Sequence, residues 1–150
     1  MKLIQSQIRN IKTGENCEII EPVNLYDCTL GRNVFIGPFV EIQKGVKVGE
    51  NSRISSHTFV CELVTIGKDC FVGHGVNFVN DLFKEGSRGG SIENWKETFI
   101  QDEVMIGSGS IILPVKVCGG CVIGAGSVVT KDCKIKGIYV GNPAKLVRRL

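Results

Sequence analysis

The sequence predicts an all-β fold, a parallel β-helix wound from six-residue repeats, on three observations. Apolar side chains recur every six residues, a period of neither an α-helix nor a simple strand, at Leu30, Ile36, Ile42, Val48, Ile54, Val60, Ile66, Val72 and Phe78. The next residue is often glycine, which suits a tight corner, as at Gly31, Gly37, Gly49, Gly67, Gly73, Gly107 and Gly124. The fifth residue is small or β-branched, as at Val34, Ser52, Thr58, Val64 and Val76. Together these positions indicate hexapeptide repeats.

Three hexads form one coil of eighteen residues, and successive coils stack about 4.8 Å apart. Residues that lie eighteen positions apart in the sequence are therefore expected to be neighbours in space. A second set of apolar positions follows at Ile100, Ile106 and Ile112 and then, one residue out of step, at Val117, Ile123, Val129 and Ile135. The inward side chains stay buried only because the coils stack on one another.

The length and composition fit one domain, residues 1–150. Residues 1–29 keep the period weakly, and Ile19, Pro22, Leu25 and Cys28 indicate irregular starting coils. A net charge of +3 gives no argument for nucleic acid as a partner, and no segment resembles a secretion signal or a membrane span. Seven cysteines without a disulfide framework suit a reducing compartment, so a cytoplasmic location is expected.

Two segments depart from the repeat. Residues 82–98 form a polar interruption that contains the single tryptophan, Trp95, and a loop of this length inside a regular solenoid is usually either functional or disordered. A lone large aromatic side chain also needs a surface to pack on. Residues 136–150 are expected to cap the stack, with Pro143 ending the coils and residues 144–150 forming a short helix or hook.

Several strings resemble the left-handed β-helix acyltransferase superfamily: IGSGSIILP at 106–114, IGAGSVVTKD at 123–132 and VGNPAK at 140–145. The left hand comes from this resemblance and opposes the usual right-handed crossover rule. The resemblance implies acetyl-CoA as co-substrate, bound along the later coils. It also implies that small residues let the pantetheine arm approach the backbone, at Gly107, Ser108, Gly109, Gly124, Ala125 and Gly126. Two lysines, Lys131 and Lys145, would bind the phosphates. One departure is ILPVKVC at 112–118, where a missing residue shortens a corner.

A narrower resemblance covers residues 54–83, ISSHTFVCELVTIGKDCFVGHGVNFVNDLF, and the later WKET at 95–98. These strings are similar to nucleotide-sugar 3-N-acetyltransferases. The resemblance implies transfer of an acetyl group from acetyl-CoA to the amino group of a dTDP- or UDP-linked 3-amino-deoxysugar, for surface polysaccharide biosynthesis.

Amide formation from a thioester needs a neutral amine, and the chain offers candidate groups at two corners. His57 stands at an outward corner position, and a histidine side chain in water titrates near neutral pH, which suits a general base. His74 occupies the same corner as a candidate substrate ligand. Asn80 and Asp81 follow the last coil before the interruption, where Asn80 can orient the acceptor and Asp81 can hold or deprotonate its amine.

Glu62 precedes Asn80 by eighteen residues, so the two are expected to stack on one edge as an acceptor clamp, and Trp95 of the interruption is a further candidate substrate ligand. A prism face separates this edge from the histidines. If both groups serve one site, a neighbouring subunit must supply half of it, and the sequence therefore predicts a homotrimer with intersubunit sites, the assembly common in the superfamily.

Three alternatives remain open. An O-acetyltransferase acting on a sugar or serine hydroxyl would use His57 as its base. A γ-type carbonic anhydrase needs three histidines for zinc, and with only two in the chain Cys61 would have to substitute, so no metal is expected. A purely structural β-helix is disfavoured by the polar interruption and by the IGAGSVVTKD string. The sugar, the nucleotide, the position of the amine and the acyl group stay undetermined.

Overall fold

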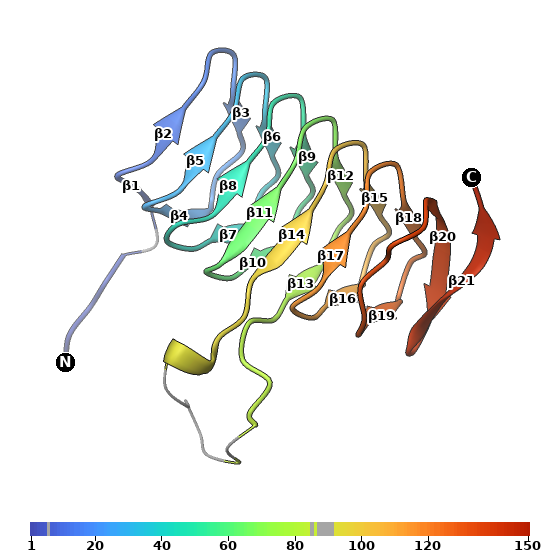
Figure 1. Cartoon of the computed structure of the whole chain (residues 1–150). Coiled ribbons are helices and arrows are strands. Elements are labelled where there is room, and N and C mark those ends of the chain that lie inside the picture. Colours follow the sequence, from blue (N-terminus) through green and yellow to red (C-terminus); the bar gives the residue numbers. More distant parts are fainter. Residues whose placement is uncertain (6, 85, 87–91) are drawn as a thin grey trace.

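A computed structural model describes residues 1–5, 7–84, 86 and 92–150. Among these residues the chain winds as a parallel β-helix, with the coils stacked along one axis and each coil crossing three sheets in turn (Figure 1). Every neighbouring pair of strands within the coils is parallel, as expected for a left-handed β-helix of hexapeptide repeats. The predicted fold class is therefore confirmed.

Each sheet collects one strand from successive coils. The first sheet holds β1 (Ile8–Arg9), β4 (Asn24–Tyr26), β7 (Glu41–Ile42), β10 (Phe59–Val60), β13 (Asn77–Phe78), β16 (Ile111–Ile112) and β19 (Val128–Val129). The second holds β2 (Lys12–Thr13), β5 (Thr29–Leu30), β8 (Lys47–Val48), β11 (Val64–Ile66), β14 (Thr98–Ile100) and β17 (Lys116–Val117). The third holds β3 (Glu18–Ile19), β6 (Phe35–Ile36), β9 (Arg53–Ile54), β12 (Phe71–Val72), β15 (Met105–Ile106), β18 (Val122–Ile123), β20 (Gly137–Gly141) and β21 (Ala144–Arg149).

The six-residue column predicted from the sequence lines the interior. All nine positions from Leu30 to Phe78 are at most 3% exposed, and the second set is equally buried from Ile100 to Val129. Ile135, the last predicted member, is 42% exposed instead. Tyr139 closes the interior there, because its ring is buried and its hydroxyl donates to the carbonyl of Ile135 at 2.8 Å.

Polar residues at the fifth position of the hexad satisfy backbone groups inside the prism. The hydroxyl of Ser52 donates to the carbonyl of Gly67, that of Thr58 to Gly73 and that of Ser110 to Gly124. These buried hydroxyls therefore stabilise the corners by giving buried carbonyl oxygens a hydrogen-bond donor.

The strand register explains both irregularities of the repeat. Asn77 pairs backwards with Phe59 and forwards with Ile111, so the coil that contains the interruption is nearly twice as long as its neighbours, yet the stack is undisturbed. The described part of the interruption includes the short 3-10 helix η1 (Ile92–Asn94), while residues 85 and 87–91 lie outside the described residues. Later coils are one residue shorter than the regular coil, as in the pair Ile106 and Ile123. The predicted short corner near Pro114 is thus confirmed.

Both ends of the stack differ in detail from expectation. The first coils are regular rather than irregular: Ile8 pairs with Leu25 and Glu18 with Phe35, again one residue short of the eighteen-residue spacing. At the other end, residues 144–150 form no helix; β21 turns back antiparallel to β20, which corresponds to the predicted hook and covers the edge of the third sheet. Within the described residues, no helix is long and apolar enough to cross a membrane.

Truncating one buried column residue should cost much more stability than truncating an exposed one. Ile54 is fully buried, so Ile54→Ala is expected to lower the free energy of unfolding by about 2–5 kcal/mol. Met105, which is 51% exposed and lies two coils farther along the same sheet, serves as control, and Met105→Ala should change the free energy of unfolding by about 0.5 kcal/mol or less. Urea unfolding of both variants measures the difference; equal losses would contradict the assignment of the column to the core.

Candidate functional site

The candidate base lies on the corner at which the chain passes from the third sheet to the first. We call this the histidine corner, formed in successive coils by residues 37–39, 55–57, 73–75, 107–109 and 124–126. His57 is the last of the three corner residues in its coil. Its φ of 63° lies in the left-handed region, and this backbone conformation directs the side chain outward. Its ring stacks on that of Phe39 one coil below, with 4.8 Å between centroids and 28° between planes. His57 is therefore exposed but held in place on one face.

His74 lies one coil above on the same corner. Its Nδ1 is 2.8 Å from the hydroxyl of Ser56, and its backbone N–H donates to the hydroxyl of Ser108 at 3.1 Å. The sequence predicted that the two histidines share a corner, and the structure brings them together there. Ser56 was not anticipated, although it stands eighteen residues before His74.

Three glycines follow His57 along the histidine corner toward the C-terminal coils. They are Gly75, Gly109 and Gly126, which hold the position of His57 in the next three coils. A Cβ added at any of the three would meet no atom within 4 Å, so the space in front is open. We call these residues the glycine strip. The predicted coenzyme residues 107–109 and 124–126 all lie along it.

The glycines of the strip provide access to the backbone rather than N–H donors. The N–H of Gly109 donates to the carbonyl of His74, and that of Gly126 donates to the carbonyl of Ser108. These two amides are therefore committed to bonds between coils. A ligand can approach the strip closely, but it would not displace these bonds.

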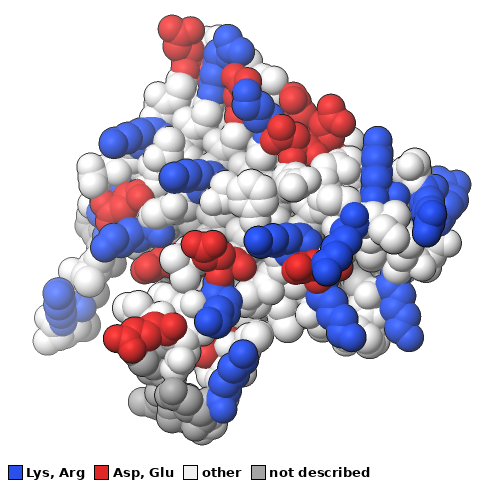
Figure 2. Space-filling model, in the orientation of Figure 1, with Lys and Arg blue, Asp and Glu red and all other residues white. Residues whose placement is uncertain are grey.

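The two predicted lysines lie at different corners of the last coils. Lys145 stands in β21 opposite Val140, beside the turn where Gly141 donates to Ser127 at the end of the histidine corner. Lys131 follows β19 and lies across the first sheet, at the opposite corner. The C-terminal coils carry an excess of positive charge, and Figure 2 shows basic side chains gathered over them. Residues 131–150 contain a single acidic residue, Asp132, and the basic residues Lys131, Lys134, Lys136, Lys145, Arg148 and Arg149.

The predicted acceptor residues gather at the corner from the first sheet to the second, which we call the asparagine corner (residues 43–45, 61–63 and 79–81). The side chain of Asn80 donates to the carbonyl of Glu62 at 3.2 Å, so the predicted stacking is observed. Asp81 accepts from the N–H of Phe83, and the interruption returns to this corner where Lys96 donates to the carbonyl of Asn80.

Trp95 immediately precedes this return. Its indole Nε1 is buried and has no hydrogen-bond partner among the residues that the structure describes. The expectation that the tryptophan packs on a surface agrees with the burial of this atom, and its role as a substrate ligand stays a prediction.

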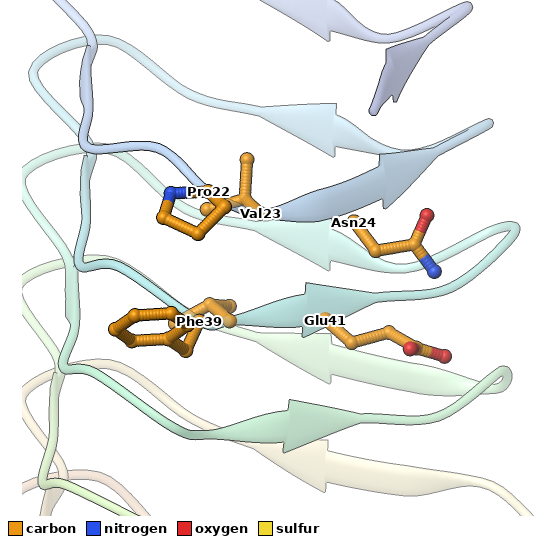
Figure 3. Close-up of a pocket in the computed structure, with 6 residues that line it drawn as sticks. Pro22, Val23, Asn24, Phe39 and Glu41 are labelled. Atoms are coloured by element: carbon orange, nitrogen blue, oxygen red, sulfur yellow. The ribbon is translucent and has the colours of Figure 1, made fainter. Parts of the chain in front are cut away.

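One connection across the first sheet was not anticipated. Gln43 donates to Glu41 at 3.0 Å and accepts from the N–H of Glu62 at 3.3 Å, so hydrogen bonds link strand β7 of the first sheet to the asparagine corner. Near the histidine corner, the outward side chains border a hollow lined by Pro22, Val23, Asn24, Phe39, Val40 and Glu41 (Figure 3).

Two segments of the chain match models of hexapeptide transferases. Residues 27–62 match the bacterial transferase hexapeptide (six repeats), and residues 98–131 match the hexapeptide repeat of succinyl-transferase. The chain has 30% sequence identity to the polySia specific acetyltransferase NeuO, whose crystal structure matches it with a TM-score of 0.62. The match covers 93% of this chain and 76% of NeuO. The chain belongs to the hexapeptide-repeat family of transferases.

Two further proteins are similar to this chain, one in sequence and one in fold. The bifunctional protein GlmU of Thermotoga petrophila is 30% identical over 165 residues, and the match covers 91% of this chain but 36% of GlmU. The chain thus spans about a third of the length of the curated relatives it matches first. A mutant of AntD, an N-acyltransferase from Bacillus cereus in complex with dTDP and coenzyme A, has a TM-score of 0.74 at 21% identity, covering 94% of this chain and 81% of AntD.

The zinc alternative needs Cys61 together with both histidines. Within the described ranges of one chain, no three side chains of His, Cys, Asp or Glu come together. Cys61, the substitute ligand, lies on the asparagine corner, so it would reach the histidines only across a subunit boundary. Burial raises the pKa of its thiol to about 12, which disfavours the thiolate that binds zinc.

Proposed function

We propose that the protein is an acetyl-CoA-dependent N-acetyltransferase whose acceptor is the amino group of a nucleotide-linked 3-amino-deoxysugar, used in surface polysaccharide biosynthesis. The observation that carries this proposal is the position of His57 at the foot of the glycine strip, with the basic C-terminal coils at its other end. The acetyl-CoA arm would lie on the strip and its phosphates near Lys145. AntD shows that this fold can hold dTDP and coenzyme A in one protein.

The chemistry needs one base close to the end of the thioester arm. His57 accepts the proton that the acceptor ammonium must lose and passes it to solvent, and the neutral amine nitrogen then bonds to the thioester carbonyl carbon. The C–S bond breaks, the departing thiolate takes the second proton from the nitrogen, and a C–N bond replaces the C–S bond. The Ser56 hydroxyl beside Nδ1 of His74 orients that second ring as a ligand for the acceptor.

The acceptor would also contact the asparagine corner of a neighbouring subunit. Glu62, Asn80, Asp81 and Trp95 lie one sheet away from His57 within the chain, so they serve the same cleft when subunits pack as a cyclic trimer. The buried indole N–H of Trp95, unpartnered within the described part of the chain, suits an acceptor oxygen. A cytoplasmic location fits this function, because both nucleotide sugars and acetyl-CoA are intracellular metabolites, and all seven thiols are free.

Mixing two inactive variants tests the shared site. His57→Asn and Asp81→Asn should each lose activity alone, whereas trimers formed from an equal mixture after unfolding and refolding should regain about a quarter of the wild-type rate, the share expected when each site joins two random subunits. Acetyl-CoA turnover is the measurement, with each refolded variant alone as control. Mixtures as inactive as the separate variants would place the whole site within one subunit.

A thiol-release assay with acetyl-CoA and a panel of dTDP- and UDP-linked amino sugars tests the function itself. Turnover of a 3-amino sugar, with a product heavier by one acetyl group in mass spectrometry, is expected. An O-acetyltransferase acting on a sugar or serine hydroxyl is the second candidate, favoured by the 30% identity to NeuO, an acetyltransferase described as specific for polySia. Turnover of hydroxyl acceptors alone would decide for it and against the amine.

A further inference from the structure

The hollow beside the histidine corner has the surface of a sugar site. Pro22 and Phe39 lie at one end of the hollow, and Asn24 and Glu41 lie at the other end, with their side chains extending away from the ring of Phe39 (Figure 3). Phe39 is 57% exposed, so much of its aromatic surface is free to contact a ligand. A hollow with an aromatic ring at one end and a carboxylate and an amide at the other offers both kinds of contact that a pyranose needs, apolar for its face and polar for its rim.

The hollow adjoins the candidate base. Phe39, which forms its apolar side, is the residue on which the ring of His57 stacks at 4.8 Å. The glycine strip begins on the opposite side of His57, at Gly75. His57 therefore lies between an open strip and a partly apolar hollow, as a base must lie between a donor and an acceptor.

The polar side of the hollow carries negative charge near β4 and β7. One oxygen of Glu41 accepts from Gln43, and a carboxylate has further lone pairs for an ammonium group. Burial first, and then the nearby carboxylates of Glu41 and Glu62, raises the pKa of Tyr26, which shows a negative field there.

A positive charge lies beyond this negative field. Arg9 donates to the side chain of Asn24 at 3.2 Å and lies 5.1 Å from the centre of the Tyr26 ring. Its guanidinium group therefore lies at the edge of the hollow next to Asn24. It belongs to β1, the strand that adjoins β4 on the side away from His57.

We propose that this hollow is the subsite for the amino-sugar ring of the acceptor. Phe39 packs against the apolar face of the sugar, Glu41 binds the ammonium group before its proton passes to His57, and Asn24 binds a ring hydroxyl. Arg9, beyond Asn24, meets the phosphate that links the sugar to its nucleotide. This inference rests on the proposed function and places the acceptor ring beside the histidine corner, in a hollow whose lining residues were not among the substrate ligands predicted from the sequence.

Two substitutions with matched controls test the subsite. Glu41→Gln keeps the shape of the side chain and removes its charge. Phe39→Leu should keep the backbone conformation, because Leu63 holds the equivalent position on the asparagine corner with a φ of 69°, where Phe39 has 61°. The controls are Glu18→Gln and Phe71→Leu, outward residues of the third sheet. The two test variants should raise the KM for the amino-sugar acceptor about tenfold or more, with the KM for acetyl-CoA unchanged, and the controls should change neither.

The outcomes separate this inference from the proposed function. Wild-type turnover with an unchanged acceptor KM in both test variants would overturn the subsite and leave the function standing. If the wild type acetylates no amino sugar, calorimetric titration with a dTDP-linked 3-amino-deoxysugar still decides. Binding that is weakened in Glu41→Gln and Phe39→Leu but not in the controls supports the subsite, and equal binding in all variants, or none in the wild type, overturns it.

Discussion

His57→Asn is expected to lower kcat for amine acetylation by about a hundredfold or more, the usual contribution of a positioned general base. Asparagine fits the backbone at this position, because Asn33 and Asn51 hold equivalent positions at another corner with φ values of 56° and 58°. The loss would therefore report the missing proton acceptor rather than a disturbed corner. Steady-state kinetics with saturating amino sugar measure it, and the KM for acetyl-CoA should stay within about twofold.

His74→Asn is the matched control for this variant. His74 lies on the same corner and is also exposed, but it is oriented by Ser56 and lies farther from the hollow. Its replacement should raise the acceptor KM and leave most of kcat. A modest effect of His57→Asn on kcat would instead mean that the acceptor arrives already deprotonated, and the role of His57 would shift from base to ligand.

The period of six was sufficient to predict the columns because a stacked coil converts sequence offsets into contacts. Glu62 and Asn80, eighteen residues apart, touch as expected, and both histidines share a corner. Handedness could not be obtained in this way, since coils of either hand place the same residues inward, and it came from the family resemblance. Ile135 was misplaced because the last coil no longer keeps the six-residue period: Cys133 still pairs with Val117, but it is Tyr139 that pairs with Ile123 and takes the buried place.

The hollow was missed for a related reason. Asn24 pairs with Glu41, one residue short of the eighteen-residue spacing, and the first coils carry only a weak six-residue pattern. With those residues treated as irregular, nothing placed Asn24 beside Glu41 or Pro22 next to Phe39. A search that allowed a coil shorter by one residue would have found the pairing, as the same spacing in the later coils shows.

Gly109→Asn is expected to weaken acetyl-CoA binding about tenfold or more, seen as a rise in the KM for acetyl-CoA with kcat for the bound complex largely retained. Gly109 has a φ of 71° and open space in front of it, so the new side chain would project into the glycine strip. Asparagine is chosen because it tolerates this backbone region better than most residues. Calorimetric titration with coenzyme A checks the result independently of turnover.

Gly45→Asn separates a blocked strip from a strained backbone. Gly45 has a φ of 78° and equally open space, but it lies on the asparagine corner, away from the strip. The two variants should therefore lose similar, small amounts of unfolding free energy in urea, while only Gly109→Asn loses affinity for coenzyme A. Equal affinities in both variants would remove the strip from the donor site, and with it the argument that places His57 between donor and acceptor.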